Sequence, residues 1–83
     1  MDERPYWLSG NPDKCDVCAA PITTEFYDMM TKTPAGGRGP WGCLCPNCAM
    51  NGVGIGRVGQ GYGQHYRQDA NNPTDKRFYK VAG

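Results

Sequence analysis

The chain lacks the apolar material needed for a large hydrophobic core. Hydrophobic residues make up only 39% of its 83 residues, while glycine occurs 12 times and proline seven times. A chain this short and this poor in aliphatic side chains usually needs a disulfide, a metal or a partner chain to fold. We expect one small domain, and its five cysteines are the candidates for the missing stabilisation.

Signals for secretion and membrane insertion are also missing. The first ten residues, MDERPYWLSG, have neither the basic start nor the apolar stretch of a secretory signal. No run of about 18 apolar residues could form a membrane span. We therefore expect a cytoplasmic protein with no membrane partner. In that reducing compartment, clustered cysteines bind metal more often than they form disulfides.

Residue patterns typical of enzymes are absent as well. The sequence shows no paired carboxylates and no nucleophile accompanied by a base. Its glycine-rich segment contains G-x-G-x-x-G at Gly54, Gly56 and Gly59, but no βαβ unit surrounds this string. We therefore predict neither a dinucleotide site nor a small-molecule substrate, and we expect a protein without enzymatic activity.

The strongest positive signal is a pair of Cys-x-x-Cys motifs. CDVC at 15–18 and CPNC at 45–48 are separated by 26 residues. Each tight turn, or knuckle, can present two thiolates on one side of the backbone, and four thiolates are a tetrahedral ligand set for structural zinc. The spacing predicts one metal ion per chain, bound by Cys15, Cys18, Cys45 and Cys48.

Cys43 stands outside this pattern. It precedes the second knuckle in CLCPNC, and with Cys45 it forms only a Cys-x-Cys spacing. On a strand these two side chains would share one face, without the turn that a knuckle provides. We expect Cys43 to be a small residue packed inward, or a spare thiol near the metal.

The two knuckles and the β-rich segment between them resemble a zinc ribbon. The resemblance implies a small metal-stabilised β fold with an antiparallel sheet of three to four strands and little or no helix. Rubredoxins hold a redox iron with similar loops, so an iron site for electron transfer is a remote alternative. Ala19 and Ala49 stand where rubredoxins typically have glycine, and the dense acidic surface of rubredoxins is missing.

Hydrophobic alternation and turn residues predict the order of the elements. Residues 1–14 should form an irregular lead-in that is anchored by Tyr6, Trp7 and Leu8, because proline and glycine interrupt it. Residues 22–33 alternate as a strand, and 34–40 should form a turn or flexible loop. GPWGCLC then returns as a second strand.

The remainder of the predicted zinc-ribbon domain, which covers residues 15–83, follows the second knuckle. Residues 49–51 could form a single helical turn, but the six glycines that follow exclude the long helix of a treble-clef finger. The two-residue period of the glycines predicts a strand at 52–63, kinked near Val58, whose bare face permits close backbone approach. A closing strand is expected at 77–82.

Charge is distributed unevenly along the chain. Residues 1–48 carry four Lys or Arg against six Asp or Glu, whereas residues 49–83 carry five against two. The basic half could face an anionic partner. Candidate contacts to nucleic acid or a protein partner are Arg38, Trp41, Arg57, Tyr62, His65, Tyr66, Arg67 and Lys80. The alternatives are that the tyrosines cover a small core, and that Arg38 and His65 are ordinary surface residues.

A longer set of motifs resembles small zinc-ribbon proteins of tailed bacteriophages. CDVC, GPWGCLCPNC, GVGIGRVGQGY and RFYKV follow the order of that group over about residues 15–81. Cys43 and the extra Val58 depart from its pattern, which affects strand register. The resemblance implies the fold and a phage setting, in the host cytoplasm or the virion, without a biochemical activity.

Two functions are compatible with these features. The first is a nucleic-acid-binding or transcription-associated module that uses the basic half of the chain. The alternative is a protein-docking accessory factor or minor virion protein, because Trp7, Trp41, Met29 and Met30 are more apolar material than so small a chain can bury.

Overall fold

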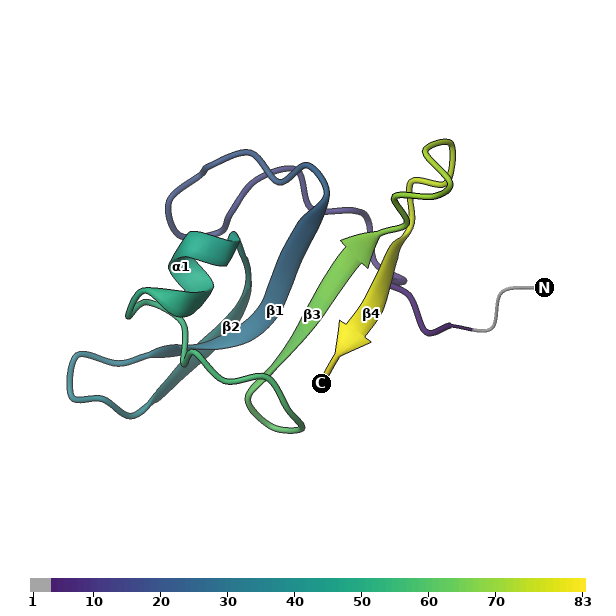
Figure 1. Cartoon of the computed structure of the whole chain (residues 1–83). Helices are drawn as coiled ribbons and strands as arrows, with labels where there is room; N and C mark the ends of the chain where they lie inside the picture. Colours follow the sequence, from purple (N-terminus) through teal and green to yellow (C-terminus); the bar gives the residue numbers. More distant parts are fainter. Residues whose placement is uncertain (1–3) are drawn as a thin grey trace.

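The computed structural model describes residues 4–83, which contain one four-stranded antiparallel sheet (Figure 1). In chain order the elements are β1 (Glu25–Lys32), β2 (Arg38–Leu44), α1 (Pro46–Met50), β3 (Gly63–Gln68) and β4 (Phe78–Ala82). The strands lie in the order β2-β1-β3-β4. The predicted small antiparallel β fold with little helix is confirmed.

β1 and β2 form the hairpin that joins the two knuckles. Their register pairs Met29 with Gly42 and Met30 with Trp41, and it shifts between Met30 and Lys32. β2 begins at Arg38, inside the segment predicted as a loop, so the connecting loop is shorter than expected. Gly39 permits this tight return, because a Cβ there would lie 2.6 Å from Thr31 Oγ1.

The prediction of a strand at 52–63 is wrong. This segment is irregular and makes only two isolated bridges, Thr31 with Gly54 and Gly59 with Gly63. Positive φ angles of 94° at Gly52, 72° at Gly56 and 85° at Gly61 take the backbone out of the extended region. The glycine period resembled a strand only because glycine, without a Cβ, tolerates several backbone conformations.

The strand that lies in this region is β3, which begins where the predicted strand ends. The glycine-rich segment instead lies beside the end of β1. Lys32 donates its N–H to Val53 O at 3.0 Å, and Ile55 donates its N–H to Met30 O at 2.9 Å. The expected close approach is therefore made to the chain's own hairpin.

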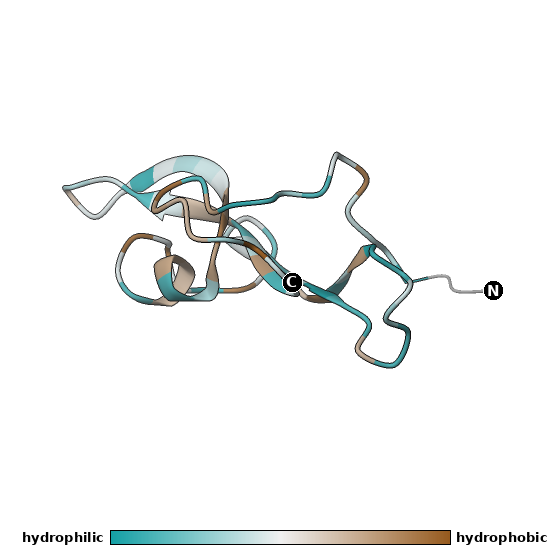
Figure 2. Ribbon diagram, turned by 90° about the horizontal axis from the view of Figure 1, so that it is seen from above, coloured by the Kyte–Doolittle hydropathy of each residue, from teal (hydrophilic) through white to brown (hydrophobic). Residues whose placement is uncertain are grey.

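The sheet carries a hydrophobic core on each face. One core contains Met29, Leu44 and Ala49 together with three cysteines, and α1 lies over it (Figures 1 and 2). The other contains Ile22, Phe26, Tyr66 and Phe78. The two cores are small, which agrees with the low apolar content of the sequence.

Within the described part of the predicted lead-in, residues 4–14, residues 5–7 run along the outer edge of β4. Trp7 donates its N–H to Phe78 O at 2.8 Å, and Lys80 donates its N–H to Pro5 O at 2.9 Å. The Trp7 ring packs edge-on against Phe26 and Tyr66, whereas Leu8 is 83% exposed. The anchor therefore includes Trp7 and excludes Leu8, and positions 1–3 of the lead-in lie outside the described residues. Among residues 4–83, no helix has the length and apolar character needed to cross a membrane.

Candidate metal centre

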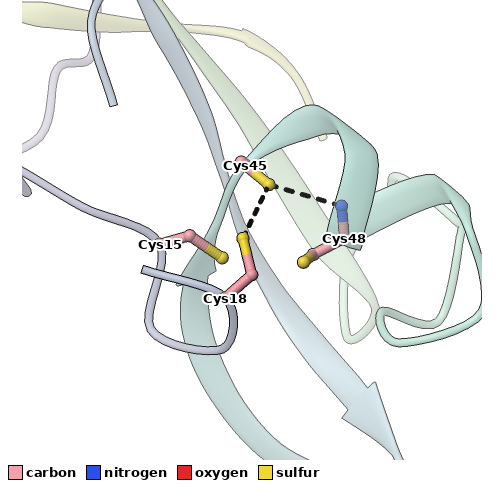
Figure 3. Close-up of side chains that lie close together, drawn as sticks. All are labelled: Cys15, Cys18, Cys45 and Cys48. Carbon is pink, nitrogen blue, oxygen red and sulfur yellow. Dashed lines mark hydrogen bonds between the residues drawn. The ribbon is translucent and has the colours of Figure 1, made fainter. Parts of the chain in front are cut away.

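The structure brings the four predicted ligand cysteines together beside the hairpin (Figure 3). All four Sγ atoms lie within 4.8 Å of one another, and the Sγ atoms of Cys18 and Cys45 are 3.7 Å apart. Four sulfurs placed tetrahedrally about 2.3 Å from one ion would be about 3.8 Å apart. The donor set and its spacing therefore fit a single thiophilic metal ion.

The first knuckle is a turn that precedes β1. Val17 N–H points at Cys15 Sγ at 3.5 Å, and Cys15 N–H donates to Ala20 O at 2.8 Å. Ala19 has a φ of 62°, the left-handed conformation that rubredoxin-like loops typically give to glycine. The turn therefore forms with alanine at this position.

The second knuckle is the beginning of α1. Cys45 is the N-cap, and its Sγ accepts a hydrogen bond from Cys48 N–H at 3.4 Å. Pro46 occupies the first helical position, where its missing N–H costs nothing and its fixed φ suits the helix. The helical turn predicted at 49–51 thus begins earlier, within the knuckle, and its capping holds two sulfurs on one side.

The thiols of the metal-free site differ strongly in acidity. Burial, together with hydrogen bonds to the other three thiols, raises the pKa of Cys48 to about 12. Burial also acts to raise the pKa of Cys15, but hydrogen bonds from backbone N–H groups outweigh it and lower that pKa to about 6. Metal binding must therefore displace at least the Cys48 proton, which favours binding at higher pH.

Cys43 is half-buried and packs against the core that contains Phe26, on the opposite face of the sheet. Burial, together with the charges of Asp16 and Asp28, raises its pKa to about 11. Its position agrees with the prediction of an inward-packed residue outside the ligand set.

Sequence reasoning missed Asp16, which ties the first knuckle to β2. Its carboxylate accepts the Cys43 N–H at 2.8 Å, and its own N–H donates to Cys43 O at 2.9 Å. An aspartate within a turn is a known acceptor for nearby backbone N–H groups. Its partner is 27 residues away, however, so no local pattern could identify the contact.

Half of the predicted partner contacts are distributed over β3 and β4. Tyr66 is 8% exposed and belongs to a core, which agrees with the alternative role for this tyrosine. His65 stacks on Tyr27 with ring centroids 4.2 Å apart and bonds to Glu25 at 2.8 Å. Arg67 is exposed and lines a cavity of about 350 Å³, while Lys80 is half-buried.

The other half gather near the β1–β2 loop. The guanidinium of Arg57 lies 4.1 Å from the centre of the Tyr62 ring, and that of Arg38 lies 5.4 Å from it. Trp41 is 47% exposed on β2, three residues after Arg38. We call Arg38, Arg57 and Tyr62 the Arg–Tyr cluster.

Comparisons with known proteins do not assign the chain to a family. No protein-family model, curated protein or solved structure matches it. The classification therefore depends on the geometry of the chain itself. It is a small antiparallel β protein in which four cysteines are positioned to bind one metal ion, as in a zinc ribbon.

Proposed function

We propose that this protein is a non-enzymatic binding module of the phage zinc-ribbon type, folded around a structural zinc ion, which contacts nucleic acid. The Arg–Tyr cluster is the observation that carries the proposal. It joins two cations that are 19 positions apart in the sequence, Arg38 and Arg57, around one aromatic ring.

A structural role for the metal follows from the closed ligand set. Four thiolates complete a tetrahedral zinc site and leave no position open for a substrate. Three of the four cysteines are buried, and they form half of one hydrophobic core. Metal–thiolate bonds would thus contribute directly to folding, in place of the missing apolar side chains.

Electrostatics support nucleic acid as the ligand of the Arg–Tyr cluster. A guanidinium forms paired hydrogen bonds with phosphate oxygens, and contact with an aromatic ring restricts its motion before binding. Lys32 is paired with Arg38 in the β1–β2 register and adds a third cation. None of the ion pairs found in residues 4–83 includes Lys32, Arg38 or Arg57, so their charges are available to phosphates.

Salt-dependent binding tests the nucleic-acid function. We expect the zinc-loaded protein to bind oligonucleotides with an affinity that falls steeply as salt rises. The double variant Arg38→Ala/Arg57→Ala should bind more weakly, with a salt slope smaller by about 1.5. Lys76→Ala, in the loop at the other end of the sheet, removes one positive charge and is the control for each of the two single variants. Absence of oligonucleotide binding at low salt would exclude the function.

Metal analysis tests the centre itself. We expect about one zinc per chain in the wild-type protein and in Cys43→Ala, and loss of zinc in Cys45→Ser. A red, redox-active iron protein would support the rubredoxin-like alternative instead. Equal metal content in Cys43→Ala and Cys45→Ser, whether full or lost, would show that the ligand set is wrong.

Protein docking is the second candidate function, favoured by apolar side chains that the fold leaves exposed. Leu8 is 83% exposed and Val81 is 52% exposed, and both lie near the edge formed by β4 and the lead-in. A host or virion protein could cover them. Isolation of a stoichiometric complex that Leu8→Ser/Val81→Ser abolishes would support this function over nucleic-acid binding.

A further inference from the structure

We infer that the ligand at the Arg–Tyr cluster is single-stranded nucleic acid, whose bases stack on Trp41 while its phosphates contact Lys32, Arg38 and Arg57. The inference rests on the proposed nucleic-acid function and specifies its ligand class. It depends on the placement of Trp41, on the contacts of Tyr62 with two arginines, and on the absence of a groove-reading helix among the described residues.

Strand register places Trp41 in line with the cations. Arg38 pairs with Lys32 and Trp41 pairs with Met30, and these two positions on β1 are two residues apart. Side chains two residues apart share a face of the sheet and are about 7 Å apart along the strand. Trp41 therefore lies next to the Lys32–Arg38 pair along the hairpin, across the register shift and at the end of β2 near the β1–β2 loop.

The two tryptophans differ in their packing: Trp7 is packed against other rings, whereas Trp41 is exposed. Trp7 packs against Phe26 and Tyr66 with ring centroids 5.3 and 5.4 Å apart, and its Nε1–H donates to Gly10 O. Among residues 4–83, Trp41 has no aromatic neighbour and no acceptor for its indole N–H, and it is 47% exposed. An indole left in this state is available for stacking with a nucleic-acid base.

Tyr62 orders the cations that surround this surface. Its ring contacts both guanidinium groups of the Arg–Tyr cluster, and its carbonyl oxygen accepts the Met30 N–H at 3.0 Å. The hydrogen bond from β1 thus positions Tyr62, and contact with its ring restricts the two arginine side chains. Less conformational entropy is then lost when the arginines bind phosphates.

The acidic residue on β1 closest in sequence to Met30, the partner of Trp41, is Asp28, which lies two residues before it. It is paired in register with Cys43 and Gln64, and it is half-buried. Burial raises the pKa of its carboxyl. Lys32, Arg38 and Arg57 outnumber the two carboxylates in this region, those of Asp28 and of Asp16, which accepts the Cys43 N–H.

No helix in residues 4–83 is suited to reading a duplex groove. α1 is the one helix in the described residues; it has five residues, and its Cys48 and Ala49 are buried at the metal centre. Helical groove recognition needs a longer helix that can enter the groove. A duplex also keeps its bases stacked internally, whereas the unstacked bases of a single strand can stack on an exposed indole.

The experiment compares single-stranded oligothymidylate with a duplex of the same length, using the zinc-loaded full chain at one salt concentration. We expect the single strand to bind at least about tenfold more tightly and to quench tryptophan fluorescence. Trp41→Ala should abolish the quenching and weaken single-strand binding about tenfold without changing the salt slope. Val81→Ala, another exposed apolar residue, is the control and should bind normally.

Two outcomes would overturn the inference in different ways. Equal binding of duplex and single strand, with Trp41→Ala unchanged, would contradict the single-strand assignment while the salt-dependent nucleic-acid function stands. Absence of binding by both oligonucleotides at low salt would remove the nucleic-acid function, and the inference with it.

Discussion

At the scale of single residues, the glycines at positions 54 and 63 make room for Met29. A Cβ on Gly54 would lie 2.8 Å from both Met29 Sδ and Ala49 O, and one on Gly63 would lie 2.9 Å from Met29 Cε. Met29 is fully buried between them. These two glycines are required because side chains there would collide with the core beside the metal centre.

Gly54→Ala should therefore destabilise the protein. Neither the Ala49 backbone nor the buried Met29 can move away freely, so we expect a loss of about 2–3 kcal/mol in the free energy of unfolding. Gly10→Ala is the matched control, because a Cβ there meets nothing within 4 Å. Urea unfolding of the zinc-loaded proteins measures both. An equal loss in the two variants would contradict the packing argument.

Asp75 is a second residue whose role is local and testable. Its carboxylate accepts hydrogen bonds from Arg77 Nε at 2.9 Å and Nη2 at 2.8 Å, and from the Tyr79 hydroxyl. Hydrogen bonds from the Arg77 side chain, followed by that from Tyr79, hold the pKa of this carboxyl well below its usual range. The cluster orders the approach to β4.

Asp75→Asn should change how stability depends on pH. Because folded Asp75 titrates below its unfolded value of about 3.9, its contribution is complete above that pH and is lost as the pH falls toward the lowered value. The wild-type protein should therefore be more stable than Asp75→Asn near neutral pH, and the difference should shrink below about pH 4. Urea unfolding of both proteins across this range measures the difference between their free energies of unfolding. Loss of metal in acid affects both proteins alike, so it cancels in this difference. A difference independent of pH would contradict the prediction.

At the scale of elements, the two edges of the sheet are protected differently. The lead-in covers the edge of β4 with backbone hydrogen bonds and the Trp7 ring. At the other edge, β2 carries a register shift, Pro40 and the charge of Arg38. Proline, irregular register and charge all discourage edge-to-edge association. β2 thus keeps an exposed face without presenting a regular edge.

Truncation of Trp7 should release the lead-in from the sheet. Trp7→Ala removes ring contacts with Phe26 and Tyr66, so we expect a loss of about 3 kcal/mol in the free energy of unfolding. Leu8→Ala is the neighbouring control and should change stability by less than about 0.5 kcal/mol, since Leu8 is 83% exposed. Chemical denaturation distinguishes them, and a larger loss in Leu8→Ala would contradict the observed anchor.

At the scale of the whole molecule, the metal centre and one hydrophobic core share three cysteines. Cys15, Cys45 and Cys48 pack with Met29 and Leu44. Without metal, the buried thiols could not replace four metal–sulfur bonds, and the two small cores would have to hold the fold alone. The metal should therefore decide whether the chain folds.

Chelation should unfold the protein reversibly. We expect removal of zinc to abolish the β-sheet circular dichroism and the dispersion of amide NMR signals, and added zinc to restore both. Zinc uptake at neutral pH should also release protons, since the pKa of Cys48 is about 12 in the metal-free site. Unchanged spectra after complete metal removal would contradict a structural role for the ion.

Local patterns predicted a large part of this fold. Alternation located β1, the GPWGCLC segment contains most of β2, and β4 lies within the closing strand expected at 77–82. The glycine-rich segment was misjudged because its period of two matched a strand, while its positive φ angles are set by the turns it makes beside β1. β3, with its mixture of Gln, His, Tyr and Arg, carried no comparable hydrophobic signal.

The sequence by itself determined the four ligand cysteines, because a Cys-x-x-Cys turn places its two sulfurs through local backbone geometry. It also determined that the core is small, because so few apolar residues allow no larger one, and the alternation of residues 22–33 indicated β structure. Only the tertiary structure decided that Tyr66 is buried while Arg38, Arg57 and Tyr62 meet near an exposed Trp41. Those positions depend on strand order and register, which are set by contacts between segments far apart in the chain.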